Sequence, residues 1–228
     1  MGDDQVVVSS VKANAADPVG PLPLGFPVVV GITGASGAIY GVRLLMALKA
    51  AAVETHLVVT KMGAVTLAHE MEMTLADVSA LATYTYAPQD LAAPIASGSF
   101  ATRGMIVAPC SIKTLSAVAH SYTDNLLARA ADVTLKEGRP LVLAIREAPF
   151  HLGHLRLMVQ AAEIGAIIFP PLPAFYARPA TVEVLVDQSV GRILARLGLS
   201  NDLYPVWQGL DSPGAYVGTD HATDPSAQ

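Results

Sequence analysis

A turn rich in glycine and serine follows the first apolar run of the chain and is suited to binding an anion. The run PVVVGIT at 27–33 leads into GITGASG at 31–37, where a helical pattern starts. Backbone N–H groups and the helix dipole favour negative charge at such a helix start. Ser36 lies at the entrance, where its hydroxyl can cap the helix or donate to a ligand. A tight strand-to-helix turn without a ligand is the alternative.

The spacing of these glycines argues against a dinucleotide site. It is G-x-x-G-x-x-G rather than G-x-G-x-x-G, and Thr60 and Lys61 stand where nicotinamide enzymes carry Asp or Glu. A second polar turn follows the apolar run 104–110, and its helix start carries Ser111, Lys113 and Thr114. The sequence therefore predicts two anion or polar-ligand sites at strand ends.

Charged residues in the next segment are candidates for binding a phosphate. Arg129 and Lys136 are seven apart in one helical pattern, about two turns, so both lie on the same face. Arg146 and Glu147 end the following strand pattern, at the edge where doubly wound sheets bind ligands. A solvated helix face, with both cations paired to neighbouring acidic residues, is the alternative for the first pair.

Other reactive side chains have simpler interpretations. Cys110 ends an apolar strand pattern and is interpreted as core rather than as a nucleophile. His151 and His154 are three apart with no third strong ligand in register, so no metal site is predicted. From pattern alone, Glu70 belongs to an exposed helix face and Tyr176 packs in a proline-rich loop.

Composition limits the class of protein. The 228 residues suffice for one sizeable α/β domain. Only 14% of residues are charged, against about 25% in ordinary domains, which predicts a homo-oligomer with large apolar contacts. A net charge of −5 argues against nucleic-acid binding. The single cysteine, the absence of a membrane-spanning apolar run and the acidic N-terminus without a secretory signal together predict a cytoplasmic protein.

Short apolar runs alternate with helical patterns between residues 25 and 208, the predicted domain. Strands are predicted at 27–33, 55–60, 104–110, 140–147 and 166–171. Helices are predicted at 37–51, 62–71, 74–82, 111–120, from an N-cap at Asp124 to Lys136, 151–165 and 181–197. Continuous Val, Ile and Leu strands between helices predict a Rossmann-like, doubly wound parallel sheet in three α/β/α layers. Residues 1–24 are predicted to be a flexible leader and 209–228 a flexible tail.

Long ordered segments of the chain resemble the bacterial flavin prenyltransferases of the UbiX type. Over roughly residues 27–208 the matching segments are GITGASGAIYGVRLL, SGSF, PCSIKTLSAVAHSYTDNLLARAADVTLKEGRPLVLAIREAPFHLGHLRLM, GAIIFPPLPAFYARP and GRILARLGL. The resemblance implies a flavodoxin-like fold, FMN bound between subunits, a dodecamer built from trimers, and no metal. The implied reaction moves dimethylallyl from dimethylallyl monophosphate to N5 and C6 of reduced FMN. The prenylated FMN would serve a UbiD-type decarboxylase.

The resemblance also implies roles for individual residues. FMN is expected to contact Gly34, Ala35, Ser36, Thr60, Ser111, Ile112, Lys113, Thr114 and Arg146. Dimethylallyl phosphate is expected to contact Arg129, Lys136, Tyr176 and Arg192, with Trp207 as an aromatic neighbour. Glu70 is expected near flavin N5, and Ser36 with Glu147 would move protons. Some members have Trp where Leu91 stands, so one wall of the prenyl pocket differs here.

Two other functions fit parts of the sequence. FMN-dependent decarboxylases of cysteine-type substrates share the fold, but they carry a P-A-S-A-N-T-like loop and a catalytic His. This chain has PIASGS at 94–99, and His69 is near the helix position of that His. A non-catalytic FMN-binding or assembly protein is the other alternative, although storage alone would not require Glu70, Lys136, Arg146, Glu147 and Arg192 together.

Overall fold

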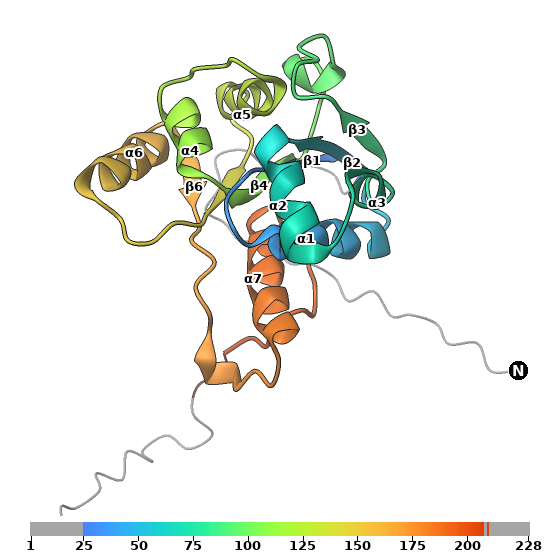
Figure 1. The fold of residues 1–228 in the computed structure, drawn as a ribbon, viewed down its shortest axis with the longest axis vertical. Helices are drawn as coiled ribbons and strands as arrows, with labels where there is room; N and C mark the ends of the chain where they lie inside the picture. The colour runs from blue at the N-terminus through green and yellow to red at the C-terminus, as the bar shows by residue number, and fades with distance from the viewer. Residues whose placement is uncertain (1–24, 208, 210–228) are drawn as a thin grey trace, which may run out of the picture.

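One six-stranded parallel sheet forms the centre of the protein (Figure 1). The computed structural model describes residues 25–207 and 209. The strands are β1 (Val28–Ile32), β2 (Thr55–Val59), β3 (Tyr84–Tyr86), β4 (Gly104–Cys110), β5 (Leu141–Ile145) and β6 (Ala166–Ile168). Their order is β3-β2-β1-β4-β5-β6, and every neighbouring pair is parallel.

The strand order is that of a doubly wound sheet. Without the short edge strand β3, it is the flavodoxin-like order, in which the chain builds one side of the sheet and then crosses to the other. The strands that follow β1 are added first on one side of it and then on the other, so the switch point lies between β1 and β4. There Val28 pairs with Gly104 and Gly31 with Val107, in parallel. Ligands of such sheets bind outside the carboxyl ends of the strands at this switch point.

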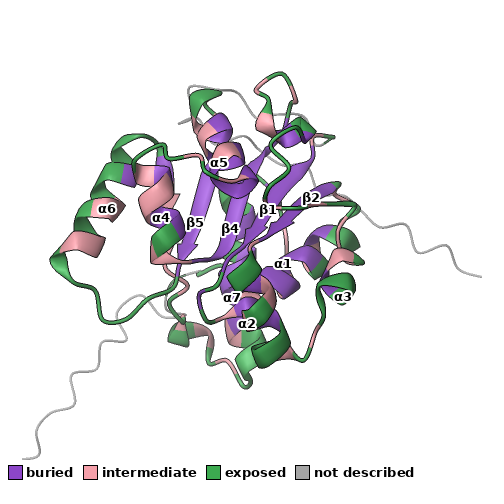
Figure 2. Cartoon of the chain, turned by 45° about the horizontal axis from the view of Figure 1, so that its top comes forward, coloured by how far each residue is buried: buried purple, intermediate pink, exposed green. Residues whose placement is uncertain are grey.

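Helices cover both faces of the sheet, as Figure 2 shows for the buried strands between them. The helices are α1 (Ala38–Ala50), α2 (Lys61–Met71), α3 (Leu75–Ser79), α4 (Ile112–Ala119), α5 (Leu126–Lys136), α6 (Leu152–Glu163) and α7 (Val182–Arg196), with short 3-10 segments η1 (Pro94–Ala96) and η2 (Phe175–Ala177). The core on one face is formed with α1 and α7, and the core on the other with α4, α5 and α6. The predicted three-layer fold is confirmed.

Alternate strand residues supply the two cores. In β1, Val28, Val30 and Ile32 belong to the core on the α1 and α7 face, whereas Val29 belongs to the core on the opposite face. Every residue of β1, β2, β4 and β5 is buried. A strand covered on both faces favours apolar residues on both of them, which explains the nearly continuous apolar runs in the sequence.

The structure differs from the sequence prediction at a few places. Strand β3 was not predicted because its YTY segment is mostly exposed and lacks an apolar run. The prediction that Asp124 caps α5 is wrong. The cap is Asn125, whose Oδ1 accepts from the Ala128 N–H at 3.0 Å, while Asp124 accepts from the Asn125 amide at 2.6 Å. The predicted leader 1–24 and nearly all of the predicted tail 209–228 lie outside the described residues.

The buried hydroxyl of Thr33 joins the ends of β1 and β4. It donates to the Pro109 carbonyl at 2.7 Å and accepts from the Ser111 N–H at 2.8 Å, and Thr33 is only 1% exposed. Without the hydroxyl, the Ser111 N–H would lose this partner, and the Pro109 carbonyl would keep only the longer bond from the Thr33 N–H, at 3.3 Å. This side chain therefore holds together the two loops that border the switch point.

We predict that Thr33→Val lowers the free energy of unfolding by about 1–3 kcal/mol, because it leaves the Ser111 N–H without its partner and removes the shorter of the two hydrogen bonds to the Pro109 carbonyl. Thr33→Ser is the matched control, since it keeps the hydroxyl and loses only a methyl group. Urea unfolding at one fixed protein concentration measures the difference. Equal midpoints for the two variants would contradict the bridging role.

Candidate functional site at the carboxyl edge of the sheet

Three helices begin at the carboxyl edge of the sheet, directly after the strands that precede them. Two of them start with a hydroxyl cap: Thr60 Oγ1 accepts from the Gly63 N–H at 3.1 Å, and Ser111 Oγ accepts from the Thr114 N–H at 3.4 Å. Helix α1 starts instead at Gly37, which has a positive φ of 98° and no side-chain cap of its own. The edge thus gathers three partly positive helix starts.

The loop between β1 and α1 lies against the start of α2. A Cβ atom on Gly34 would lie 2.4 Å from Cβ of Met62, so the two segments can approach this closely only with glycine at position 34. Ala35 is buried, while Ser36 is exposed at the outer side of the loop. The predicted glycine loop is therefore a tight turn, and it also presents backbone and hydroxyl groups at the ligand edge.

Glu70 supplies the missing cap of α1. Its Oε2 accepts from the Gly37 N–H at 2.8 Å and the Ala38 N–H at 2.9 Å. Partial burial opposes its ionisation, but hydrogen bonds from Ser36 and from these two N–H groups, with the charge of Arg146, hold the pKa of Glu70 below its usual value. Glu70 is thus an anion at a helix N-terminus, hydrogen-bonded to Ser36, a contact that the sequence analysis did not predict.

Arg146 and Glu147 follow β5 at the same edge, and both are exposed. The Arg146 N–H donates to the Cys110 carbonyl at 3.1 Å, and its Cγ lies 4.0 Å from the position that a Cβ on Gly37 would occupy. The Glu147 carboxylate accepts from the Ala148 N–H at 3.0 Å. The predicted FMN contacts therefore come from four strand ends and meet at one edge of a single chain.

This set of groups suits a ligand that carries a phosphate and many hydroxyls. The helix starts at Thr60 and Ser111 offer N–H groups, Arg146 offers a guanidinium, and the hydroxyls can donate or accept. Ile112 is half-buried and Lys113 is exposed on the first turn of α4. These features fit FMN.

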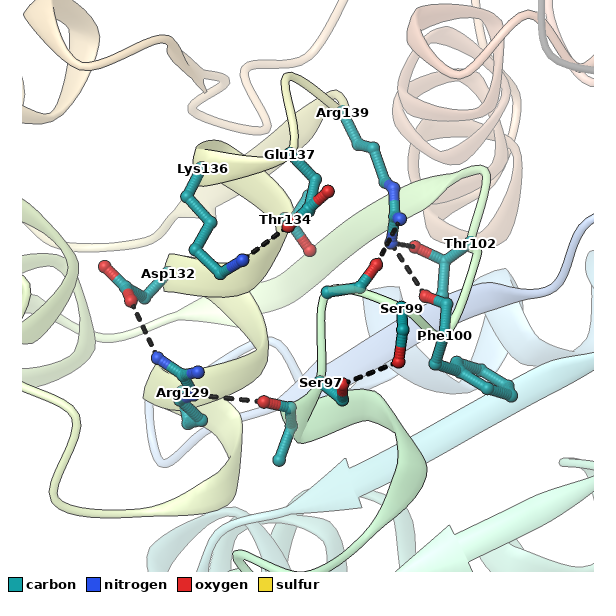
Figure 3. A network of polar contacts seen from close by, with 12 residues as sticks. Ser97, Ser99, Phe100, Thr102, Arg129, Asp132, Thr134, Lys136, Glu137 and Arg139 are labelled. Carbon is teal, nitrogen blue, oxygen red and sulfur yellow. Dashed lines mark hydrogen bonds and ion pairs between the residues drawn. The ribbon is translucent and has the colours of Figure 1, made fainter.

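Arg129 and Lys136 lie away from this edge, on α5 (Figure 3). The Arg129 guanidinium donates to the Ala96 carbonyl at 3.1 Å and pairs with Asp132 at 3.2 Å, and Lys136 pairs with Glu137. Both acidic pairings expected for a solvated face are therefore present. The same contacts place the two cations beside the loop that carries Ser97 and Ser99.

Tyr176, Arg192 and Trp207 form a separate group. Tyr176 meets the ring of Trp207 edge-on at 5.6 Å and donates to the Pro205 carbonyl at 3.2 Å. The guanidinium of Arg192 lies 5.7 Å from the centre of the Tyr204 ring. Tyr176, Arg192 and Tyr204 line a small hollow. Packing against neighbours, the simpler interpretation of Tyr176, is therefore also observed.

Within one chain, the sheet separates the cationic residues that are predicted to bind the substrate phosphate. Helix α5, with Arg129 and Lys136, covers one face, and α7, with Arg192, covers the other. Figures 1 and 2 both show α5 and α7 on opposite sides of the sheet. Leu91, the position where some relatives have Trp, is exposed in the loop before η1. One protomer alone does not bring these residues together.

The simpler interpretation of Cys110 holds, and His151 has a structural contact. Cys110 is fully buried, and burial raises the pKa of its thiol to about 12, so it is core and not a nucleophile. His151 caps α6, because its Nδ1 accepts from the Gly153 N–H at 3.0 Å. Within the described part of the chain, no three His, Cys, Asp or Glu residues are grouped to hold a metal ion.

Sequence reasoning missed two residues that shape this region. Thr33 was included in the apolar strand predicted at 27–33, although a hydroxyl at the last position of that strand is a visible sign of a polar contact. Arg139 was not considered, because its contacts are with a loop about forty positions away in the chain. Contacts at such separation leave no local pattern.

Comparisons with known proteins agree with this geometry. The family model for flavoproteins matches residues 24–193. The flavin prenyltransferase UbiX of Escherichia coli K12 is 57% identical over 184 residues, which cover 79% of this chain and 97% of that protein.

Two solved structures are also similar. A crystal structure of AnUbiX (PadA1) with FMN and dimethylallyl pyrophosphate has a TM-score of 0.80 and 46% identity, covering 82% of this chain and 99% of that one. A dodecameric FMN-dependent Ubix-like decarboxylase from Escherichia coli O157:H7 has a TM-score of 0.78 and 48% identity, covering 80% and 100%.

We predict that Glu70→Gln lowers the melting temperature at neutral pH, because it removes an anion from the N-terminus of α1, worth about 0.3–1 kcal/mol at such positions. The folded-state pKa of Glu70 is lowered, so its stabilisation is present above the unfolded pKa and is lost as pH falls through the folded pKa. The difference in melting temperature between the two proteins should therefore shrink in acid. A constant difference from neutral to acidic pH would contradict the charged cap.

Proposed function

Because the chain belongs to the UbiX-type flavin prenyltransferase family, we propose that it joins a dimethylallyl group to N5 and C6 of reduced FMN, with dimethylallyl monophosphate as donor. The protein is a transferase that acts on FMN. The observation that supports the proposal is that the residues expected to contact FMN lie at one sheet edge, in a chain 57% identical to a flavin prenyltransferase. Mass spectrometry of FMN after anaerobic incubation with both substrates tests it.

The FMN phosphate should bind at the start of α2 or of α4. Glu70 already occupies the N-terminus of α1, and a second anion there would be repelled. The caps of the other two helices are hydroxyls, at Thr60 and Ser111, which can also donate to phosphate oxygens. Arg146 follows β5 at the same edge, and its guanidinium could offset the phosphate charge.

The dimethylallyl phosphate should be held by Arg129, Lys136, Arg192 and Tyr176. Breaking the allylic C–O bond moves the bonding electrons onto the phosphate and leaves positive charge on the allyl group. Three converging cations can stabilise the departing phosphate, so the proposal requires no divalent ion. The flavin face and a nearby carboxylate would stabilise the allyl charge, and exclusion of water would protect it from hydrolysis.

Proton movement in the reaction is assigned to Ser36, Glu70 and Glu147. Glu70 is already hydrogen-bonded to Ser36, and its lowered pKa keeps it ionised near neutral pH. A carboxylate at this position can accept a proton from N5 or stabilise positive charge beside it. Glu147 lies after β5 at the same edge and is exposed to solvent, so it can exchange protons with water.

The separation of the cations implies that active sites form between protomers. Helices α5 and α7 cover opposite faces of one sheet, so Lys136 of one copy can meet Arg192 only of another copy. The similar Escherichia coli O157:H7 protein is dodecameric. We propose the same assembly here, in agreement with the low charged fraction of 14%.

We propose that a UbiD-type decarboxylase receives the prenylated FMN. We also propose that the protein is cytoplasmic. No helix among the described residues is long and apolar enough to cross a membrane. A cysteine-type decarboxylase has less support. The loop at 94–99 is PIASGS rather than the P-A-S-A-N-T-like loop of those enzymes, and the chain is 57% identical to a flavin prenyltransferase. A non-catalytic FMN carrier would not need cations on both faces of the sheet.

We predict that prenyl transfer by the wild-type protein survives EDTA, and that Lys136→Ala keeps FMN while turnover falls about 30- to 4000-fold, the usual cost of removing a cation from a water-poor site. Lys49→Ala, at the far end of α1, is the matched control. Anaerobic assays of prenylated FMN with and without chelator measure both effects. Turnover abolished by EDTA, or a wild-type rate in Lys136→Ala, would show that the phosphate is handled in another way.

We predict that two inactive variants, Lys136→Ala and Arg192→Ala, regain activity when they are unfolded and refolded together. In a random mixture, about one quarter of the shared sites receive both native cations, because each must come from a different variant chain. If both cations served the same site from one chain, no native site would form. Activity of the mixture against each variant refolded alone therefore decides whether sites are shared.

A further inference from the structure

Arg139 is held at a fixed place just beyond the end of α5. Its N–H donates to the Thr134 carbonyl at 2.9 Å, and the Gly138 N–H donates to the Leu135 carbonyl at 2.9 Å, with Gly138 at a positive φ of 66°. These two bonds form the helix ending in which glycine reverses the chain direction. The ending turns the half-buried Arg139 side chain back toward the loop before β4.

The guanidinium of Arg139 binds the backbone of that loop, as Figure 3 shows. One terminal nitrogen donates to the Gly98 carbonyl at 2.8 Å, and the other donates to the Phe100 carbonyl at 2.8 Å. The second nitrogen also reaches Thr102 Oγ1 at 3.4 Å. A planar group with donors in fixed directions can hold two carbonyls two residues apart, and this restricts the loop between them.

The restricted loop lies directly against Lys136. A Cβ atom on Gly98 would lie 2.6 Å from the Lys136 ammonium and 2.0 Å from Glu137 Oε1. On the other side, Arg129 donates to the Ala96 carbonyl at 3.1 Å. The segment from Ala96 to Phe100 is therefore in contact with both cations that α5 provides, and its position fixes where their charges lie.

We propose that Arg139 is a positioning residue for prenyl transfer: it fixes the 96–100 loop so that Lys136 and Arg129 are placed for the substrate phosphate. The proposal rests on the proposed function of this site. Arg139 itself donates to the loop and to Thr102, and its role does not require contact with the substrate. Without it, both cations remain in the chain but their support is loose.

The experiment compares Arg139→Ala, Arg139→Lys and Gly98→Ala with the wild-type full-length protein, using reduced FMN and dimethylallyl monophosphate under anaerobic conditions. Arg139→Ala should raise KM for dimethylallyl monophosphate about 10- to 100-fold, the scale expected when a binding group is misplaced by about 1 Å. Its kcat should change less, because saturating substrate draws the retained cations into place. FMN affinity should stay within about twofold, since the predicted FMN contacts lie at the carboxyl ends of the strands, whereas Arg139 precedes the first residue of β5.

The other variants separate positioning from folding. Arg139→Lys keeps the charge but replaces the planar fork of two terminal nitrogens by one ammonium nitrogen, which does not reproduce the two separate bonds to Gly98 and Phe100, so KM should stay raised. Gly98→Ala leaves Arg139 intact and displaces the Lys136–Glu137 pair, so it should raise KM in the same way. Arg196→Ala, at the exposed end of α7, is the control and should behave as wild type.

Three results would overturn the proposal. One is an unchanged KM in Arg139→Ala or Gly98→Ala. Another is full recovery in Arg139→Lys, which would mean that charge alone matters. The third is a loss shared equally by FMN binding and prenyl transfer, which would indicate only a structural role. Failure of the wild-type protein to prenylate FMN would instead overturn the proposed function, and the role of Arg139 with it.

Discussion

The parallel pairing of β1 with β4 is the constraint on which the site depends. Both strands run in the same direction, and the Thr33 hydroxyl links the end of β1 to Pro109 and Ser111 at the end of β4. The loops that follow the two strands therefore lie at one edge. The neighbouring strands β2 and β5 end at that edge as well. Three helix starts, two with hydroxyl caps, are therefore gathered by backbone geometry alone before any charged side chain is considered.

Glu70 divides these three helix starts between two uses. By capping α1 it neutralises one positive helix end and places a carboxylate beside Ser36. The starts of α2 and α4 keep hydroxyl caps and remain suited to a phosphate. A carboxylate therefore caps the middle of the three helix starts, and hydroxyls cap the two on either side of it.

The sheet acts as a barrier between the two cationic groups. Arg129 and Lys136 lie over one face, and Arg192 lies over the other, so a single chain does not bring these three cations together. Assembly of several copies can bring the groups together without any change of fold. Arg139 matters in this arrangement because charges that must meet a partner protomer need a rigid support in their own protomer.

The sequence alone determined most of the sheet, the helices and the glycine loop, because periodic burial and turn residues are local signals: the run at 28–32 has no polar side chain, since both faces of β1 are covered. Through the family resemblance it also predicted which residues contact FMN, and these residues lie at strand ends. Local patterns did not reveal the exposed strand Tyr84–Tyr86, the cap by Asn125, or the contacts of Glu70 and Arg139. Those depend on residues brought together from 28 or more positions apart, or on competition between adjacent side chains, and only the folded chain decides such contacts.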